Sequence, residues 1–266
     1  MSELYERKNY TLPIKYLFNT YIREYDISKC NVNILLYKGI INKEEYTKIM
    51  NLSREYRQVH IGYILKDERI NRAFEEGLAE IRKSFLEMNE LNEEDILSIK
   101  NDAIFVINKI PTCASIGNIR FLNKNTYTSF LKLANMEIYY GLDRQSNTEI
   151  IDVKGINDSK LEFHKNGILD IICNTLWYIS NGDGPTAIDY ISDTYKKYIN
   201  KQLSIDCYRN FDNMSMYDIV MYNHRYGVHH LNNTPENLEL LDISYNGNLL
   251  RELYTNVMEY SLGGRK

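Results

Sequence analysis

Two apolar, strand-like segments of this chain each end near an aspartate, and this feature restricts the fold and the chemistry most. Asp26 lies in the segment 21–28 and Asp102 lies in the segment 96–107. A carboxylate at the end of a buried strand is costly to desolvate, and a divalent cation shared by two such carboxylates compensates both. Two-metal phosphoryl-transfer sites need this arrangement. The sequence therefore predicts that Asp26 and Asp102 together bind Mg²⁺ or Mn²⁺ and act in catalysis.

The order of the predicted elements indicates an α+β protein. Hydrophobic periodicity and turn residues predict a strand, four helices, a β-hairpin and four more strands before residue 157, and mainly helices after it. The strand covers 20–27, the helices 29–38, 43–52, 54–65 and about 68–89, the hairpin 95–109, the later strands 117–122, 126–134, 137–141 and 149–154, and the later helices 167–180, 185–203 and 248–261. We therefore expect one domain over 1–157 and a helix-rich domain over 158–266.

This order resembles the palm of family B DNA polymerases of phage type. Tyr25-Asp-Ile-Ser-Lys-Cys-Asn31 is similar to their motif A, whose aspartate binds both metals, and Ser98-Ile-Lys-Asn-Asp-Ala-Ile-Phe-Val106 is similar to motif C, usually DTDSIFV. Downstream, Asn123-Lys-Asn-Thr-Tyr127 resembles the KKRY-type segment that contacts the primer, and Val153-Lys-Gly-Ile156 resembles the KG element before the thumb. The resemblance covers about residues 20–157. It implies an antiparallel palm sheet with packed helices, reduced fingers at about 40–90, and a helical thumb-like subdomain.

The chain departs from that pattern at three places. Lys100 stands where motif C has its first aspartate, and the usual fingers motif is absent between the two aspartates. The nearest substitute lies at 53–66, where Arg54, Arg57 and Lys66 either bind a nucleotide triphosphate or form the solvated side of a helix. Asn31 takes the position of the tyrosine that excludes a ribose 2′-hydroxyl, which implies loose sugar discrimination at a nucleotide-binding position.

Residues 103–136 contain no Asp or Glu in a chain that has 36 acidic residues. The same stretch contains Lys109, Arg120, Lys124 and Lys132, so it predicts a positive strip that binds phosphate backbones. Tyr127 would add stacking to it. The alternative explanation for the missing acids is that these residues form buried strands, where acidic side chains are rare. The polymerase resemblance implies that Lys124, Tyr127 and Lys154 hold the primer strand.

A different motif competes with this interpretation in the C-terminal part. The segment 226–241 resembles an HNH nuclease signature, in which His229 or His230 binds a metal or acts as a base and Asn237 orients it. The alternative is a surface turn before a helix. Similarly, Asp26 alone is explained as a helix N-cap and Asp102 alone as a turn residue.

Composition restricts the remaining classes. The net charge of −4 argues against a protein that coats nucleic acid, and the four dispersed cysteines indicate neither a zinc ribbon nor a disulfide scaffold. The N-terminus has no signal-peptide pattern and no apolar run reaches membrane-spanning length, so we expect a protein of the bacterial host cytoplasm without a membrane partner. The leading hypothesis is a template-dependent nucleotidyltransferase of phage or prophage type, acting on primer–template and nucleotide triphosphates, with other phage replication or polymerase subunits as further partners. The alternatives are an inactive polymerase-fold accessory or inhibitor protein, and an HNH-like nuclease.

Overall fold

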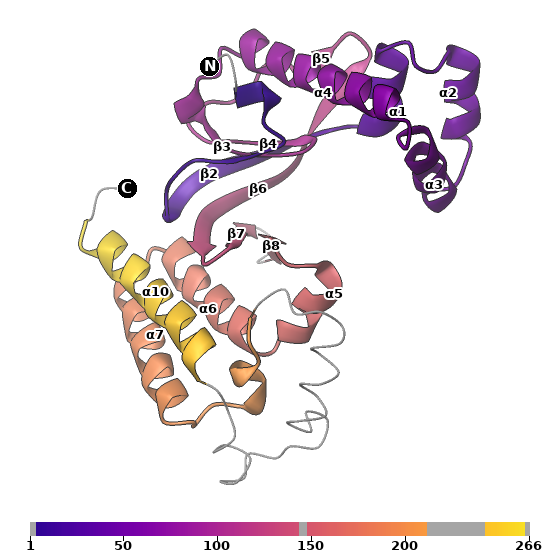
Figure 1. Ribbon diagram of the computed structural model, residues 1–266. Helices are drawn as coiled ribbons and strands as arrows, with labels where there is room; N and C mark the ends of the chain where they lie inside the picture. The colour runs from indigo at the N-terminus through magenta and orange to yellow at the C-terminus, as the bar shows by residue number, and fades with distance from the viewer. Residues whose placement is uncertain (1–3, 144–147, 212–242, 264–266) are drawn as a thin grey trace. The chain divides into compact units, whose positions relative to one another are not determined.

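The computed structural model describes residues 4–143, 148–211 and 243–263, and the chain forms two compact units (Figure 1). The first unit comprises Met1–Pro13 and Tyr21–Thr126, and the second comprises Ile14–Thr20 and Tyr127–Lys266. Two long strands, β2 (Tyr16–Ile27) and β6 (Ile119–Leu133), contribute residues to both units. The predicted α+β class is confirmed at this level, with antiparallel strand pairs and packed helices. Within the described residues no helix is long and apolar enough to span a membrane.

The first unit is a helix-covered antiparallel sheet. Its strands follow the order β1-β3-β4-β2-β6, and β5 pairs with β6. Its other elements are, in chain order, η1 (Leu4–Glu6), β1 (Asn9–Thr11), α1 (Cys30–Tyr37), α2 (Lys43–Met50), α3 (Arg54–Ile64), α4 (Glu68–Met88), η2 (Glu93–Asp95), β3 (Ile96–Lys100), β4 (Ala103–Val106) and β5 (Ser115–Ile116).

One face of this sheet is buried under α1 and α4. Apolar residues recur every three or four positions in α4 and form one continuous stripe, as expected for an amphipathic helix. This stripe packs into one core with Tyr25 and Ile27 of β2 and with Ile104 of β4. Because successive side chains of a strand point to opposite faces, Glu24 and Asp26 belong to the face of β2 opposite these helices.

The second unit packs helices on the remaining strands. Tyr16, Leu131, Ile138 and Val153 share one buried core with the helices, and α7 contacts both α6 and α10 (Figure 1). The elements are β7 (Met136–Asp143), β8 (Thr148–Lys154), α5 (Asp158–Leu161), η3 (Glu162–His164), α6 (Ile168–Ser180), α7 (Gly184–Ile199), η4 (Ile205–Tyr208) and α10 (Ser244–Ser261).

Three details differ from the sequence-based expectation. The two strands predicted at 117–122 and 126–134 are one strand, β6, because the polar residues between them continue the extended chain. The predicted strand at 20–27 begins four residues earlier, at Tyr16. The expected boundary at 157 also differs from the division between the units. β7 and β8 continue the sheet from the C-terminal part of β6, and their apolar residues pack with the helical core of the second unit.

Gly155, in the Lys154-Gly155 pair after β8, holds a conformation that a side chain would disturb. Its φ is +93°, and a Cβ there would lie 2.6 Å from the carbonyl oxygen of Asn135. We expect Gly155→Ala to lower the free energy of unfolding by about 3 kcal/mol, because backbone strain and a backbone clash add together. Gly182→Ala is the matched control, since Gly182 also has positive φ but no atom within 4 Å of the added Cβ. Its expected cost is about 1 kcal/mol. Equal losses for the two variants in urea titrations would contradict this account.

Candidate functional site: an acid pair on the first unit

Asp26 and Asp102 lie next to each other in the first unit, although 75 positions separate them in sequence. Asp26 of β2 pairs in register with Ala103 of β4, which directly follows Asp102. The Ile27 N–H donates to the Asp102 carbonyl oxygen at 3.2 Å. The two carboxyl groups are within hydrogen-bonding reach of each other when one of them is protonated. The structure therefore brings together the two aspartates that the sequence singled out.

A buried arginine donates hydrogen bonds to the backbone of the turn that carries Asp102. Lys100 pairs with Ala103, so Asn101 and Asp102 form a two-residue turn, and Asn101 has a φ of +54°. Arg82 of α4 is 1% exposed, and its Nη1 donates to the carbonyl oxygens of Asn101 at 3.2 Å and Arg7 at 2.9 Å. These bonds fix the turn, and therefore the position of Asp102.

The environment of Asp26 disfavours its ionised form. Burial, and after it the negative charge of Asp102, raise the pKa of Asp26 to about 6, while Lys124 opposes the shift. The same negative charge acts on the Cys30 thiol nearby. Burial, and after it the charges of Asp102 and Asp26, raise the pKa of this thiol. Two carboxylates in such proximity bind either a proton or a cation.

Glu24 and Lys124 extend the acid pair, and sequence reasoning did not identify Glu24. The Lys124 Nζ lies 3.6 Å from Oε1 of Glu24 and 4.0 Å from Oδ2 of Asp26. Glu24 is 1% exposed, and its other oxygen accepts from Asn125 Nδ2 at 2.8 Å. A signal for Glu24 was present in the sequence, because it lies two residues before Asp26 and thus on the same face of the strand.

The alternative explanation of Asp26 as a helix cap is wrong. The N-cap of α1 is Lys29, in a left-handed conformation and without a side-chain cap bond. Asp102 is a turn residue, as the alternative for that position stated, and it is also the partner of Asp26. Lys100 donates from Nζ to Thr11 Oγ1 at 2.8 Å and so is held against β1.

The residues predicted to bind a nucleotide do not form one cluster, and each has different contacts. Arg54 is exposed at the start of α3, whereas Arg57 donates from Nη2 to the carbonyl oxygens that end α2, of Met50 at 3.5 Å and Leu52 at 3.1 Å. Lys66 lies beyond α3, with its Nζ 4.4 Å from the centre of the Tyr63 ring. Asn31 is exposed in the first turn of α1. The structure does not place the three basic residues on one face of a single helix.

The residues predicted to bind nucleic acid belong to both units. Arg120 and Lys124 lie in the first unit, and both are exposed on β6. Within the second unit, Lys132 is exposed, and Lys154 pairs with Asp152 at 2.7 Å. Tyr127 is 0% exposed and its ring packs 5.6 Å from that of Tyr139, so this ring is not available to a stacked base.

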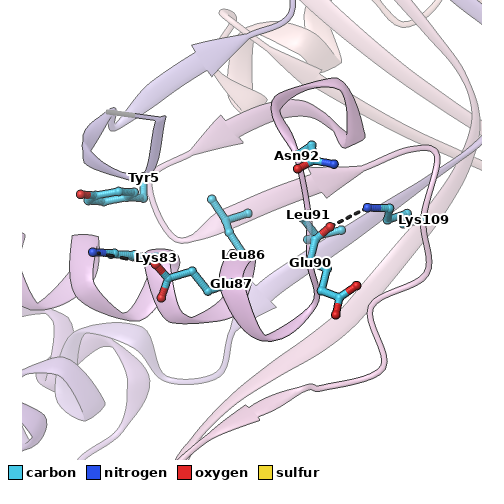
Figure 2. Close-up of a pocket in the computed structure, with 8 residues that line it drawn as sticks. All are labelled: Tyr5, Lys83, Leu86, Glu87, Glu90, Leu91, Asn92 and Lys109. Carbon is cyan, nitrogen blue, oxygen red and sulfur yellow. Dashed lines mark hydrogen bonds and ion pairs between the residues drawn. The ribbon is translucent and has the colours of Figure 1, made fainter. Parts of the chain in front are cut away.

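Two further features lie apart from the acid pair. His229, His230 and Asn237, the candidate nuclease residues, lie outside the described residues. A cavity of about 550 Å³ lies beside the C-terminal half of α4, where Tyr5 stands over Lys83 and Lys109 donates to the Glu90 carbonyl oxygen (Figure 2). Neither Asp26 nor Asp102 lines this cavity. Its Lys83 is paired with an acid, since the Lys83 Nζ lies 3.9 Å from Oε1 of Glu87. We therefore assign the chemistry to the acid pair rather than to this cavity.

The donor atoms of the acid pair suit a hard divalent cation. Carboxylate oxygens are the protein ligands that Mg²⁺ and Mn²⁺ prefer. Among the residues that the structure describes, no three His, Cys, Asp or Glu side chains gather as a metal-binding group. Mg²⁺ sites commonly use one or two carboxylates together with substrate phosphates and water. Asp26 and Asp102 fit that kind of site.

Comparison with known families finds that the sequence matches a phage protein family. The profile of the bacteriophage PBS1 gene 130 protein family matches residues 1–258. The chain belongs to this family. The family description names a bacteriophage protein and states no activity, and no curated protein matches the chain. The function of this gene 130 family member is therefore inferred from its residues.

In this family member, the raised pKa of Asp26 gives a pH-dependent stability. Below about pH 4, Asp26 is protonated in the folded and unfolded states alike, and above about pH 6 the folded state must hold an ionised, disfavoured carboxylate. We expect Asp26→Asn, without divalent cations, to raise the free energy of unfolding by about 1–2 kcal/mol at pH 8 and by almost nothing at pH 4. This figure is discounted for solvent screening, since the Asp26 side chain is 32% exposed.

The control for this comparison is Asp193→Asn, which changes an aspartate that is 62% exposed and paired with Lys197. Its stability difference should stay small and nearly constant with pH. Urea titrations at several pH values measure both variants. A destabilised Asp26→Asn protein at pH 8 would show that the acid pair carries no repulsion.

Proposed function

We propose that this protein is a metal-dependent, template-directed nucleotidyltransferase that extends a nucleic-acid primer. The observation that carries the proposal is the proximity of Asp26 and Asp102 at one end of the neighbouring strands β2 and β4. Both aspartates also lie in segments that resemble motif A and motif C of family B DNA polymerases. Phosphoryl transfer relies on positioning and on charge stabilisation, which an acid pair with bound cations provides.

In this proposal, Asp26 and Asp102 hold Mg²⁺ or Mn²⁺, which supplies Lewis-acid stabilisation of the phosphates and of the attacking hydroxyl. Glu24 and Asn125 position the Lys124 ammonium beside the pair. Lys124 thereby lowers the local negative charge that an incoming triphosphate meets. Arg82 keeps the Asp102 turn in place.

The substrates in this proposal are a primer–template and nucleotide triphosphates. Arg120 and Lys124 contact the primer–template from β6 of the first unit. Lys132 and Lys154 remain basic candidates on the second unit. Arg54 remains the exposed basic candidate for the triphosphate. The protein would act in the cytoplasm of the bacterial host, with other phage replication subunits as partners.

The direct test is primer extension on a primed template with Mg²⁺ or Mn²⁺, supplied in parallel with deoxynucleotides and ribonucleotides. The proposal predicts metal-dependent extension, and the exposed Asn31 predicts that both sugar types are used. No extension by folded protein with either metal would contradict the enzymatic proposal.

One observation favours a second function, a non-catalytic protein that retains the sheet. Lys100 replaces an acid and is bonded to Thr11, and Lys124 already neutralises Glu24 and Asp26. Such a protein would bind nucleic acid or a host protein without turnover. It would bind a primer–template in the extension assay without incorporating nucleotides, which a parallel binding measurement detects.

A further inference from the structure

Helix α3 presents an aromatic face to solvent instead of to the core. Tyr56, Val59 and Tyr63 are 72%, 58% and 65% exposed, whereas Ile61 is the buried residue of this helix. At about 100° per residue, Tyr56, Val59, His60 and Tyr63 share one face, and Ile61 points to nearly the opposite side. Large exposed aromatic side chains gathered on one helix face indicate a binding surface rather than a folding requirement.

The charge around this face favours an anionic occupant. Residues 54–66 contain three basic residues and one acidic residue. Acidic residues on either side of this stretch are engaged elsewhere, since Glu44 pairs with Lys48 at 2.7 Å and Asp67 caps α4. The acidic residue, Glu55, accepts from Ser53 Oγ at 2.8 Å at the N-terminus of the helix. Lys66 stands over the Tyr63 ring, with its Nζ 4.4 Å from the ring centre, so a cation already borders the aromatic face.

The spacing of the aromatic rings also fits a nucleic-acid strand. Tyr56 and Tyr63 are two helical turns apart, about 10 Å along the axis. Exposed rings flanked by basic side chains bind unpaired bases by stacking and their phosphates by charge, and they do so without sequence preference. A protein partner would also cover an apolar face, but the local excess of positive charge selects the polyanion.

We propose that the exposed face of α3, formed by Tyr56, Val59, His60 and Tyr63, binds single-stranded nucleic acid. The role of this strand as the unpaired template rests on the proposed function, whereas binding itself does not. Lys66 contacts a phosphate at the Tyr63 end of the face, and the two tyrosine rings stack on bases.

The test is the fluorescence anisotropy of a labelled oligothymidylate of about 12 nucleotides, titrated with the full chain in EDTA. We expect binding that weakens as salt increases, and a dissociation constant raised about tenfold by each of Tyr56→Ala and Tyr63→Ala. Tyr56→Phe and Tyr63→Phe should retain the affinity, because stacking needs the ring and not the hydroxyl. Tyr37→Ala is the control, since Tyr37 is 50% exposed on a different helix of the same unit.

Oligonucleotide binding that Tyr56→Ala and Tyr63→Ala combined in one chain leave unchanged would overturn this inference, as would no binding by wild-type protein. Tyrosine-dependent self-association in light scattering without oligonucleotide binding would assign the face to a second copy instead, and would overturn it as well. Because the assay contains no divalent cation and no triphosphate, its result is independent of primer extension. All four positions are solvent-exposed, so thermal melting should show the variants folded as wild type.

Discussion

Asp102→Asn is expected to lower the rate of primer extension at least about a thousandfold. The substitution keeps the size of the side chain but removes one of the two anionic ligands, and metal-ion stabilisation of phosphoryl transfer is worth several kcal/mol. The variant should fold well, because it also removes repulsion from Asp26. Single-turnover extension at saturating Mg²⁺ measures the loss.

Asp193→Asn provides the control for this experiment, because it removes an equal charge from the exposed Lys197 pair in the second unit. We expect it to change extension by less than about threefold, the usual size of an effect at a surface ion pair. If Asp102→Asn extended primers as well as wild type, the acid pair would have no catalytic role.

Arg82→Met is expected to lower the free energy of unfolding by about 3 kcal/mol. The arginine is 1% exposed, and its removal leaves the carbonyl oxygens of Arg7 and Asn101 without this donor. Both bonds are partly buried, and a hydrogen bond to a charged donor is worth about 1.5–3 kcal/mol. Methionine retains much of the packing of the stem, so the loss reports mainly on the hydrogen bonds.

The matched control on the same helix is Arg72→Met, because the Arg72 side chain is 84% exposed and pairs only with Glu76 among the contacts described. Its expected cost is below about 0.5 kcal/mol. Urea unfolding curves of the two variants should therefore separate clearly. A loss below 1 kcal/mol for Arg82→Met would mean that the Asp102 turn is held by other contacts, such as the Asn101 N–H bond to the Lys8 carbonyl oxygen.

The elements that carry the acid pair were predictable because their local patterns agree with their environment. The strand before Asp26 and the hairpin around Asp102 have apolar runs that the sheet buries, and the turn residues Asn101-Asp102 lie where a two-residue hairpin loop needs them. The stripe of α4 was equally readable. In these segments, local preference and tertiary packing coincide.

The partners of the acid pair were harder to predict, because their buried charges are compensated by residues that come near only in the folded protein. Glu24 is buried next to Lys124 and Asn125, which lie about 100 positions later in the chain. Arg82 occupies a core position in the spacing of Leu78 and Phe85, and this was a readable signal of a buried charge. The polar run in β6 resembled a loop because its tertiary partners were unknown.

The central claim is that Asp26 and Asp102 form a divalent-cation site, and calorimetric titration with Mn²⁺ at pH 6 and pH 8 tests it directly. The account predicts binding by wild-type protein, release of a proton at pH 6 where Asp26 is partly protonated, and loss of binding in both Asp26→Asn and Asp102→Asn. Mn²⁺ binding of equal affinity in wild type and both variants would contradict it.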